Sequence, residues 1–398
     1  MHGMSNITKK ALYLSYDGLL EPLGKSQVFE YTKKLSKSGI EFTIISFEKK
    51  INLTNSSLLK ELQSECSLNN IKWIPKIYRS YPFFLGTILN LIELALMLVY
   101  LIPTRKFQVI HLRGIMLGLS FHLLPIKIYD RLIADIRGFW PDEKADRAGW
   151  SRQGFLYKFF KHLEKDIVSK ASQVIVLTNE SKEILIDQGI EGKKITLIRT
   201  SSDKSIFKHS PDMKDAERKV LGYLGTTDTA YNFKKLAKFY SELIKQDNEF
   251  FLKIITRSNH NEIKDQLSKL GIKEEFYVIK SIINRSSLVN EINSFDLCVF
   301  YLNKNFSVKA SMPTKISECL SCGIPIGCNE FNNDIAELLN NNSGLITNFN
   351  FSDLNDFIKR LKFLKSSSYT VQNCQEIFSD NFDLDLATEK YQNVYNRF

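Results

Sequence analysis

Residues Met312–Ile326 read MPTKISECLSCGIPI, an order of residue types that predicts a loop followed by a short helix and a turn. Pro313 ends the loop, Thr314 is a suitable N-cap, and the Gly-x-Pro sequence stops the helix. A helix N-terminus offers unpaired N–H groups and a positive dipole end, so an anion such as a phosphate can bind there. Glu318, one turn into this helix, could accept hydrogen bonds from sugar hydroxyls. The alternative is a capped surface helix with a solvated glutamate.

The pattern Lys-x-x-Glu, followed by a small-residue turn and Gly-x-Pro, resembles the donor-binding segment of retaining glycosyltransferases of family 4, which have the GT-B fold. In that family two glutamates flank this loop, and the second typically holds the ribose of the nucleotide sugar. The second glutamate corresponds to Glu318, and the first, which typically touches the transferred sugar, corresponds to Ala310. Lys309, Ser311 and Lys315 could contact sugar or phosphate instead. The donor-binding residues expected in this stretch are Ser311, Pro313, Thr314, Lys315 and Glu318.

Short apolar runs alternate with helical patterns along the chain. The alternation starts at Ala11–Ser15 and restarts at Val220–Leu224 after a polar, irregular stretch. It predicts the α/β class, with parallel sheets covered by helices on both faces. We expect two Rossmann-like domains, residues 1–203 and 204–383, facing across a cleft, because ligands of such sheets bind beyond the carboxyl ends of the strands. The resemblance to GT-B proteins implies that the amphipathic helix at 384–398 returns to the N-terminal domain.

A second motif lies in the first βα loop, where residues Asp17–Val28 read DGLLEPLGKSQV. Gly24 would let the backbone approach a ligand, and Lys25 and Ser26 would place donors at the start of the next helix. The Walker spacing is absent, so a plain turn explains this loop equally well. The residue pattern is similar to that of a bacterial branch of family 4 involved in surface polysaccharides. In that fold the equivalent Gly loop reaches toward the donor diphosphate.

A third group of charged residues follows two predicted strands. His111-Leu-Arg113-Gly ends one strand, and Asp135-Ile-Arg137-Gly-Phe-Trp ends another. Charged side chains at strand ends often form a site, although ion-paired scaffolding would give the same pattern. Asp-x-Arg-Gly-Phe-Trp resembles the same bacterial branch, in which this region faces the acceptor and the reacting carbon. We expect Arg113, Asp135 and Arg137 to be catalytic and favour a satisfied core histidine for His111.

The sequence supplies no candidate for nucleophilic hydrolysis, because no Ser-His-Asp or Cys-His pairing has supporting context. Asp383-Leu-Asp385 looks like a metal-binding D-x-D motif, but it follows no predicted strand and is interpreted as a helix cap. The resemblance implies a retaining reaction without metal, and we predict no cofactor. Cations near the leaving diphosphate would stabilise an oxocarbenium-like transition state. Candidates for these cations are Lys309, which we also expect to be catalytic, Lys315, Arg257 and Lys25.

The composition of the chain limits the classes of binding partner and the cellular compartment that we expect. The 398 residues suffice for two or three domains, and a net charge of +10 suits anionic partners. No basic run with interleaved aromatics indicates a nucleic-acid groove. The six scattered cysteines suggest buried thiols in a reducing cytoplasm, and residues 1–10 lack the apolar core of a signal peptide. The apolar segment Phe83–Pro103 is long enough to span a bilayer, but Asn90 and Glu93 interrupt it, so a buried or membrane-docked helix is favoured.

The favoured function is a retaining hexosyl transfer from a UDP- or GDP-linked sugar to a glycan or polyprenyl-linked glycan acceptor in surface polysaccharide synthesis. We expect a cytoplasmic protein that can lie peripherally on the cytoplasmic face of the inner membrane, with no nucleic-acid partner. Two alternatives stay open. One is a GT-B sugar-nucleotide epimerase, and the other is a non-catalytic GT-B subunit, which the absence of a glutamate at Ala310 would favour.

Overall fold

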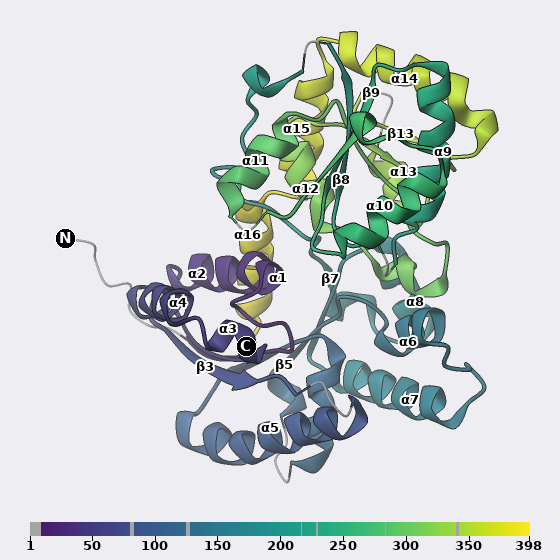
Figure 1. The fold of residues 1–398 in the computed structure, drawn as a ribbon. Helices are drawn as coiled ribbons and strands as arrows, with labels where there is room; N and C mark the ends of the chain where they lie inside the picture. The colour runs from purple at the N-terminus through teal and green to yellow at the C-terminus, as the bar shows by residue number, and fades with distance from the viewer. Residues whose placement is uncertain are drawn as a thin grey trace. The chain divides into compact units, whose positions relative to one another are not determined.

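The computed structural model describes residues 9–79, 83–124, 128–215, 217–227, 230–282, 284–339 and 342–398. The expectation for the extreme N-terminus therefore lies almost wholly outside the described residues. The chain divides into two compact units, with unit 1 formed by Met1–Ile198 and Ala387–Phe398 and unit 2 by Arg199–Leu386. The predicted boundaries, after residues 203 and 383, lie a few residues from these. In Figure 1 each unit is a sheet with helices on both faces, and the predicted α/β class is confirmed.

Unit 1 contains a seven-stranded parallel sheet of order β3-β2-β1-β4-β5-β6-β7. The central run Ala11–Leu14 is at most 2% exposed, as expected of a parallel strand covered on both faces. The strand order reverses between β1 and β4, which is where α/β sheets bind ligands. The strands are β1 (Lys9–Ser15), β2 (Ile40–Glu48), β3 (Ile71–Ile77), β4 (Val109–Arg113), β5 (Leu132–Asp135), β6 (Gln173–Val176) and β7 (Ile195–Leu197).

The helices of unit 1 include one long apolar helix, α5. Its part Leu85–Arg105 is long and apolar enough to cross a membrane, and 39% of its most apolar window is buried inside the protein. The helical elements are α1 (Pro22–Gly24), the π-helix η1 (Lys25–Phe29), α2 (Glu30–Ser36), α3 (Lys50–Leu53), α4 (Ser56–Leu68), α5 (Phe83–Arg105), α6 (Trp140–Ala148), α7 (Phe155–Lys170) and α8 (Asn179–Asp187), with the 3₁₀ turns η2 (Ile115–Leu123), η3 (Tyr129–Arg131) and η4 (Gly192–Lys194).

Unit 2 contains a six-stranded parallel sheet of order β10-β9-β8-β11-β12-β13, which reverses between β8 and β11. Gly222 in β8 is required by packing, because a Cβ there would lie 2.0 Å from the ring of Phe295. The strands are β8 (Lys219–Leu224), β9 (Phe250–Ile255), β10 (Tyr277–Lys280), β11 (Leu297–Phe300), β12 (Ile326–Cys328) and β13 (Gly344–Ile346).

The helices of unit 2 cover both faces of this sheet (Figure 1). The inner face of α12 (Thr314–Ser321), formed by Ile316, Cys319 and Leu320, is fully buried. The elements are α9 (Phe233–Gln246), α10 (His260–Lys269), α11 (Arg285–Asn293), α12 (Thr314–Ser321), α13 (Asn333–Leu338), α14 (Leu354–Ser366), α15 (Thr370–Asn381) and α16 (Leu384–Tyr395), with the 3₁₀ turns η5 (Pro211–Met213), η6 (Glu274–Phe276), η7 (Phe306–Ala310) and η8 (Phe351–Asp353).

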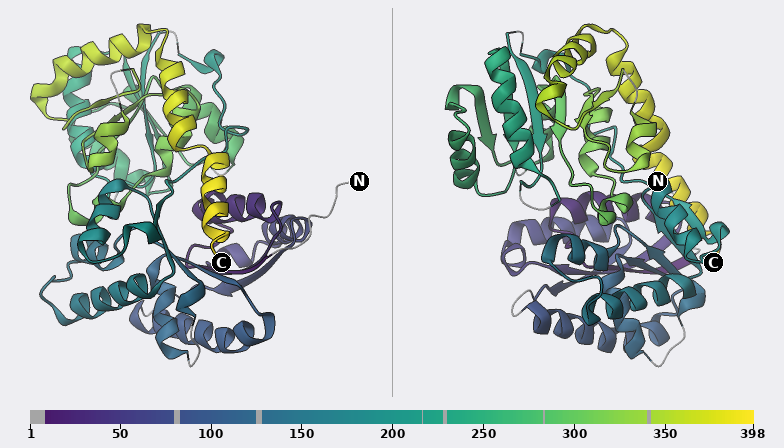
Figure 2. Two further views of the ribbon diagram at one scale, coloured as in Figure 1. Left: turned by 180° about the vertical axis from the view of Figure 1, so that it is seen from behind. Right: turned by 90° about the vertical axis from the view of Figure 1, so that its right-hand side faces the viewer.

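Helix α16 begins in unit 2, and its last turns belong to unit 1 (Figure 2). Tyr391 and Tyr395 are at most 2% exposed. The Tyr391 ring meets Tyr31 edge-on with a centroid distance of 5.2 Å, and Tyr395 meets Phe42 at 5.7 Å. Aromatic pairs in this geometry add to the burial of apolar area. The C-terminal helix therefore packs on the N-terminal unit, as the resemblance implied.

Candidate functional site

The switch point of the unit 2 sheet brings α12 against the carboxyl ends of β8 and β11. The Lys315 side chain links these elements, since its Nζ lies 4.9 Å from the ring centre of Phe300, the last residue of β11. The same Nζ lies 3.2 Å from the position that a Cβ would take on Gly225, the residue after β8. Ligands of open parallel sheets bind at this kind of edge. The candidate site is therefore built around the start of α12.

Lys315 is a buried cation without a hydrogen-bond acceptor. The residue is 5% exposed, and within the described part of the chain its Nζ has no hydrogen-bond partner. The Nζ lies 3.6 Å from the ring centre of Tyr231 and 5.2 Å from that of Tyr223. Burial lowers the pKa of Lys315 to about 8, so the amine is still mostly charged at neutral pH. Aromatic faces offset part of the desolvation cost, and an anion would supply the missing acceptor.

Gly225 keeps the approach to this amine open. The residue is exposed and has φ +112°, a conformation that side chains rarely adopt. The loop that it starts is tied to the loop after β9, because Thr227 N–H donates to Ser258 Oγ at 3.1 Å. The sequence analysis missed Gly225 and Tyr231 as site residues. A glycine directly after a predicted strand, followed by two threonines, was the available signal.

The start of α12 differs from the prediction in its cap. Pro313, with φ −62° and ψ 135°, is the N-cap, whereas Thr314 is the first helical residue. The N-cap makes no side-chain hydrogen bond to the helix, and of the first N–H groups that of Ile316 donates to the Pro313 carbonyl at 3.2 Å. This correction strengthens the anion site, because a Thr314 cap would have occupied one of these donors. Lys315 correspondingly lies in the first turn of α12 and not in the loop before it.

Glu318 lies one turn further along α12 and is half-buried. Burial raises the pKa of Glu318 to about 7, against the opposing charges of Arg285 and Lys315. The Glu318 carboxylate accepts no hydrogen bond from any of the described residues. Such a carboxylate is available as an acceptor for a ligand hydroxyl group.

The other residues of unit 2 that were predicted to contact the donor lie in the loops around α12 and β9. Ser311 is half-buried, and its carbonyl accepts a hydrogen bond of 2.8 Å from Asn332 Nδ2. Lys309 lies in η7, with its Nζ 5.8 Å from the ring centre of Phe306. Arg257 is exposed in the loop after β9, the strand next to β8. Ala310 is 1% exposed, so the position that holds a glutamate in the family is filled here by a buried methyl group.

Two predictions for the first βα loop of unit 1, the places of Gly24 and Lys25 in a phosphate site at a helix N-terminus, are wrong. The helix there starts at Pro22, so Lys25 is in its second turn and its N–H donates to the Glu21 carbonyl at 2.8 Å. The Lys25 amine is engaged with α4, 3.2 Å from Glu65 and 3.5 Å from Glu61. Gly24 is explained by packing, because a Cβ would lie 2.0 Å from the carbonyl oxygen of Gly18. Neither Gly24 nor Lys25 is placed to bind a phosphate at a helix N-terminus.

The charged residues after β4 and β5 form a buried cluster with α16. Asp135 Oδ2 lies 2.6 Å from Arg137 Nη2 and 3.1 Å from His111 Nε2. It also accepts a hydrogen bond of 3.2 Å from the Tyr391 hydroxyl, which contacts Arg137 as well. The other His111 nitrogen, Nδ1, lies 2.8 Å from the Tyr395 hydroxyl. Together these five residues, the Asp135 cluster, connect the sheet to α16.

The Asp135 cluster corrects the catalytic assignments made from the sequence. Asp135 and His111 are 0% exposed, and Arg113 is 4% exposed with its Nε 3.3 Å from Asp17 Oδ2. Burial acts to raise the pKa of Asp135, but Arg137 and His111 outweigh it and hold that pKa well below its usual range. A carboxylate that is ionised, paired and without exposed surface cannot contact a substrate. Asp135 and Arg137 therefore hold α16 on the sheet, and His111 is the satisfied core histidine that was favoured.

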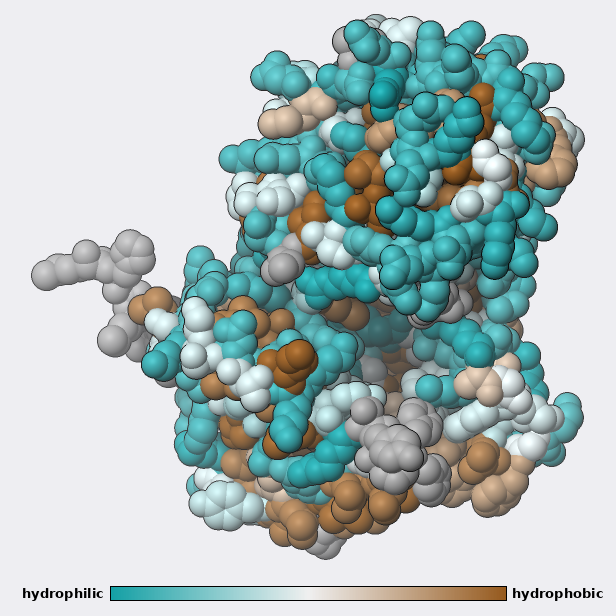
Figure 3. All heavy atoms as spheres, viewed as in Figure 1, coloured by the Kyte–Doolittle hydropathy of each residue, from teal (hydrophilic) through white to brown (hydrophobic). Residues whose placement is uncertain are grey.

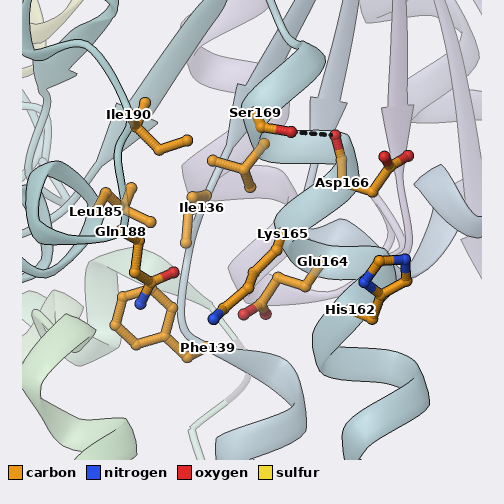
Figure 4. Close-up of a pocket in the computed structure, with 11 residues that line it drawn as sticks. Ile136, Phe139, His162, Glu164, Lys165, Asp166, Ser169, Leu185, Gln188 and Ile190 are labelled. Atoms are coloured by element: carbon orange, nitrogen blue, oxygen red, sulfur yellow. Dashed lines mark hydrogen bonds between the residues drawn. The ribbon is translucent and has the colours of Figure 1, made fainter.

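A separate hollow of about 210 Å³ lies between α7, α8 and the segment after β5 in unit 1 (Figure 4). Glu164 at its wall is 4% exposed, and burial raises the pKa of this carboxyl to about 7. Lys161 Nζ lies 2.6 Å from both Glu164 and Asp142. None of the residues predicted to act in the site lines this hollow. The ion pair of Lys161 with Asp142 connects α6 to α7.

Part of the chain matches a known protein family. Residues 25–204 match the model of Glycosyltransferase Family 4. The matched stretch, which lies mainly in unit 1, therefore resembles family 4 glycosyltransferases, and the chain as a whole has the GT-B fold. A search of curated protein sequences gave no significant match.

Solved structures with the same fold match almost the whole length of the chain. It is similar to sucrose-phosphate synthase of Thermosynechococcus elongatus (TM-score 0.75, 13% identity, 98% of each chain covered). A glycosyltransferase of Rickettsia africae gives a TM-score of 0.69 at 16% identity, with 98% of each chain covered. HepE of Anabaena, solved in complex with UDP, gives 0.69 at 13% identity, covering 98% of this chain and 100% of that one. Identities this low establish the shared fold alone.

Proposed function

We propose that this glycosyltransferase moves a hexosyl group, with retention of anomeric configuration, from a UDP- or GDP-linked sugar to a glycan or lipid-linked glycan acceptor in surface polysaccharide synthesis. The observation that carries the proposal is Lys315 at the switch point of the unit 2 sheet, a buried amine that has no hydrogen-bond acceptor among the described residues. Support comes from HepE, a protein of the same fold whose structures were solved with UDP and with UDP-glucose. The donor diphosphate is the anion that we assign to Lys315.

In this proposal the start of α12 binds the leaving group. When the bond between the anomeric carbon and the phosphate oxygen breaks, negative charge develops on the nucleoside diphosphate. The Lys315 ammonium and the first N–H groups of α12 stabilise that charge, while Glu318 accepts hydrogen bonds from the ribose. The proton of the acceptor hydroxyl passes to the departing phosphate oxygen, which balances the transfer. The proposed reaction uses no metal and no cofactor.

The proposed acceptor and location follow from charge and surface. The chain carries a net charge of +10, and the Leu85–Arg105 part of α5 is long and apolar enough to cross a membrane. Both features suit an enzyme that acts in the cytoplasm on an acceptor at the membrane surface, bound there peripherally. Nucleic acid is not a proposed partner.

One feature of the site favours a second candidate. Ala310 gives no polar group where the family has a glutamate that touches the transferred sugar, and the residue is 1% exposed. A non-catalytic subunit that keeps the fold would tolerate this loss. A sugar-nucleotide epimerase would not, because it needs acid and base groups near the sugar.

The test is to incubate the purified protein with a panel of UDP- and GDP-linked sugars, with and without a membrane glycolipid extract. Release of nucleoside diphosphate only when the extract is present supports transfer. Interconversion of donor sugars without the extract would show an epimerase instead. Donor binding without turnover in either arm would identify a non-catalytic subunit, and no donor binding would refute the site itself.

A further inference from the structure

Helix α5 has an exposed apolar stripe on the side that faces away from the sheet. Its exposed large side chains are between 42% and 70% accessible. They recur every three or four residues, which places them on one side of a helix, whereas Leu94 and Leu98 on the other side are fully buried. The stripe consists of Leu85, Leu89, Ile92, Leu96, Val99 and Tyr100.

The polar residues of α5 do not disturb this stripe. Asn90 is 0% exposed, and its side chain meets Arg79 Nη1 at 3.3 Å. Glu93 is paired with Arg79 at 2.6 Å and with Lys76 at 3.0 Å. The sequence analysis counted Asn90 and Glu93 against a membrane-spanning helix, not against a membrane-docked one. In the structure both are bound by unit 1 itself, which leaves the outer stripe without an ionised group before Arg105.

An apolar cavity of about 330 Å³ opens beside the stripe. Ile92, Leu123 and Phe159 line the cavity and are also 42–59% exposed, so they form its mouth. One wall is an aromatic cluster in which the Trp140 ring lies 5.6 Å from Trp150 and 5.2 Å from Phe160. We call this cavity the apolar slot. A cavity of this volume is large enough for a segment of hydrocarbon chain.

Helix α7 extends the exposed apolar surface beyond the slot. Phe155 is 78% exposed, Leu156 is 45% exposed, and brown atoms gather over α5 and the start of α7 in Figure 3. Exposed basic residues border this surface. They are Lys158 on α7, and Arg105 and Lys106 at the end of α5. We call the surface formed by the α5 stripe, Leu123, Phe155, Leu156 and Phe159 the docking face.

We propose that the docking face lies on an anionic lipid bilayer and that the apolar slot takes one hydrocarbon chain of a membrane lipid. A peptide segment would bring backbone N–H and C=O groups into the slot, where Thr87 and His122 are the only polar lining residues of the described part of the chain. A hydrocarbon chain has no such requirement, and the bordering cations suit anionic headgroups. The inference rests on the proposed function only in its choice of a membrane lipid as the occupant.

The docking face is tested by flotation with vesicles of equal parts phosphatidylcholine and phosphatidylglycerol, without nucleotide. We expect the wild type to float, and the triple variant Leu96→Ser, Tyr100→Ser, Phe155→Ser to bind on the order of tenfold more weakly. The matched control removes three exposed aromatic residues of unit 2, with the substitutions Phe351→Ser, Phe363→Ser and Tyr369→Ser. The control should float like the wild type. Equal loss in both variants, or no flotation of the wild type, would overturn the docking face.

The apolar slot is tested by tryptophan quenching with the same vesicles carrying brominated acyl chains. The chain has three tryptophans, and Trp73→Phe leaves only Trp140 and Trp150, both of which line the slot. We expect brominated chains to quench this variant by a large fraction, and unbrominated vesicles to leave its emission unquenched. Vesicle binding without quenching would refute the slot.

Self-association of the wild type that the triple variant abolishes, without flotation, would show that a second copy of the chain covers the docking face and would refute membrane binding. Donor binding is measured separately, so either failure leaves the proposed transfer untouched.

Discussion

The two sheets of this protein differ in how the buried charges at the ends of their strands are neutralised. In unit 1 the Asp135 carboxylate pairs with Arg137, and Tyr391 and Tyr395 of α16 complete the cluster, although Asp135 Oδ1 and Arg137 Nε and Nη1 make no hydrogen bond within the described residues. In unit 2 Lys315 is just as deeply buried, but it has aromatic faces around it and no hydrogen-bond acceptor in the described structure. A buried charge costs free energy unless it is paired. At Asp135 the chain itself supplies the partner of opposite charge. At Lys315 we assign that role to a ligand.

The largest expected effect comes from breaking the Asp135 cluster. Asp135→Asn leaves Arg137 and its neighbours without their counter-charge, so we expect the free energy of unfolding in urea to fall by about 3–5 kcal/mol. The control Asp187→Asn, at the exposed end of α8, should change it by less than about 0.5 kcal/mol. If Asp135→Asn does not fold, Tyr395→Phe removes one hydroxyl and should cost about 1 kcal/mol. Unchanged stability with lost sugar transfer would return Asp135 to the catalytic residues.

Removing the Lys315 amine should have the reverse effect. Lys315→Met keeps an apolar side chain in the aromatic surroundings, so we expect stability to be unchanged or slightly higher. Affinity for UDP-glucose or the equivalent GDP-sugar, measured by calorimetry, should fall on the order of 100-fold, because a charged hydrogen bond to phosphate is lost. Lys269→Met, at the exposed end of α10, is the control and should bind normally. Wild-type affinity in Lys315→Met would place the donor elsewhere.

A smaller effect is expected at Glu318. Glu318→Gln keeps the shape of the side chain but replaces a charged acceptor for ribose hydroxyls by a neutral one, so affinity should fall about tenfold. The exposed Glu337→Gln on α13 controls for the loss of charge. Equal affinities for the ribose and 2′,3′-dideoxyribose forms of the nucleotide in the wild type would contradict the role of Glu318.

The smallest effect is a pH profile of donor affinity. The Glu318 carboxyl, with its pKa raised to about 7, must lose its proton to accept hydrogen bonds well, whereas Lys315, with its pKa lowered to about 8, must keep its proton. Affinity for a nucleotide sugar should therefore peak between about pH 7 and 8 and fall several-fold on either side. Glu318→Gln should flatten the acid limb and Lys315→Met the alkaline limb. A profile that neither variant changes would assign the titration to other groups.

The sequence predicted the architecture well, because the signals were long and periodic. Apolar runs such as Ala11–Leu14 became buried parallel strands, and Met312–Ile326 became a loop, a helix with a buried inner face and a turn. Glu318 and Lys315 were both found as candidates. These predictions needed only local spacing, which the chain carries in its residue types.

The sequence could not show which charges pair with each other. Asp135 and Arg137 looked like site residues until Tyr391, more than 250 positions later, proved to be a partner of both. Lys25 likewise looked available until α4 supplied Glu61 and Glu65. The aromatic surroundings of Lys315 come from Tyr223, Tyr231 and Phe300, which are distant in the chain. Such contacts between distant residues decide whether a charged residue is scaffold or site.

The most direct test of the account is a thermal-unfolding titration of wild type, Asp135→Asn and Lys315→Met with a saturating nucleotide sugar. One experiment then gives the stability of each protein and its stabilisation by the ligand. The account predicts that Asp135→Asn unfolds at a lower temperature but still gains stability from the ligand, whereas Lys315→Met unfolds near the wild-type temperature and gains almost none. The opposite pattern, with ligand stabilisation lost at Asp135 and kept at Lys315, would contradict the account.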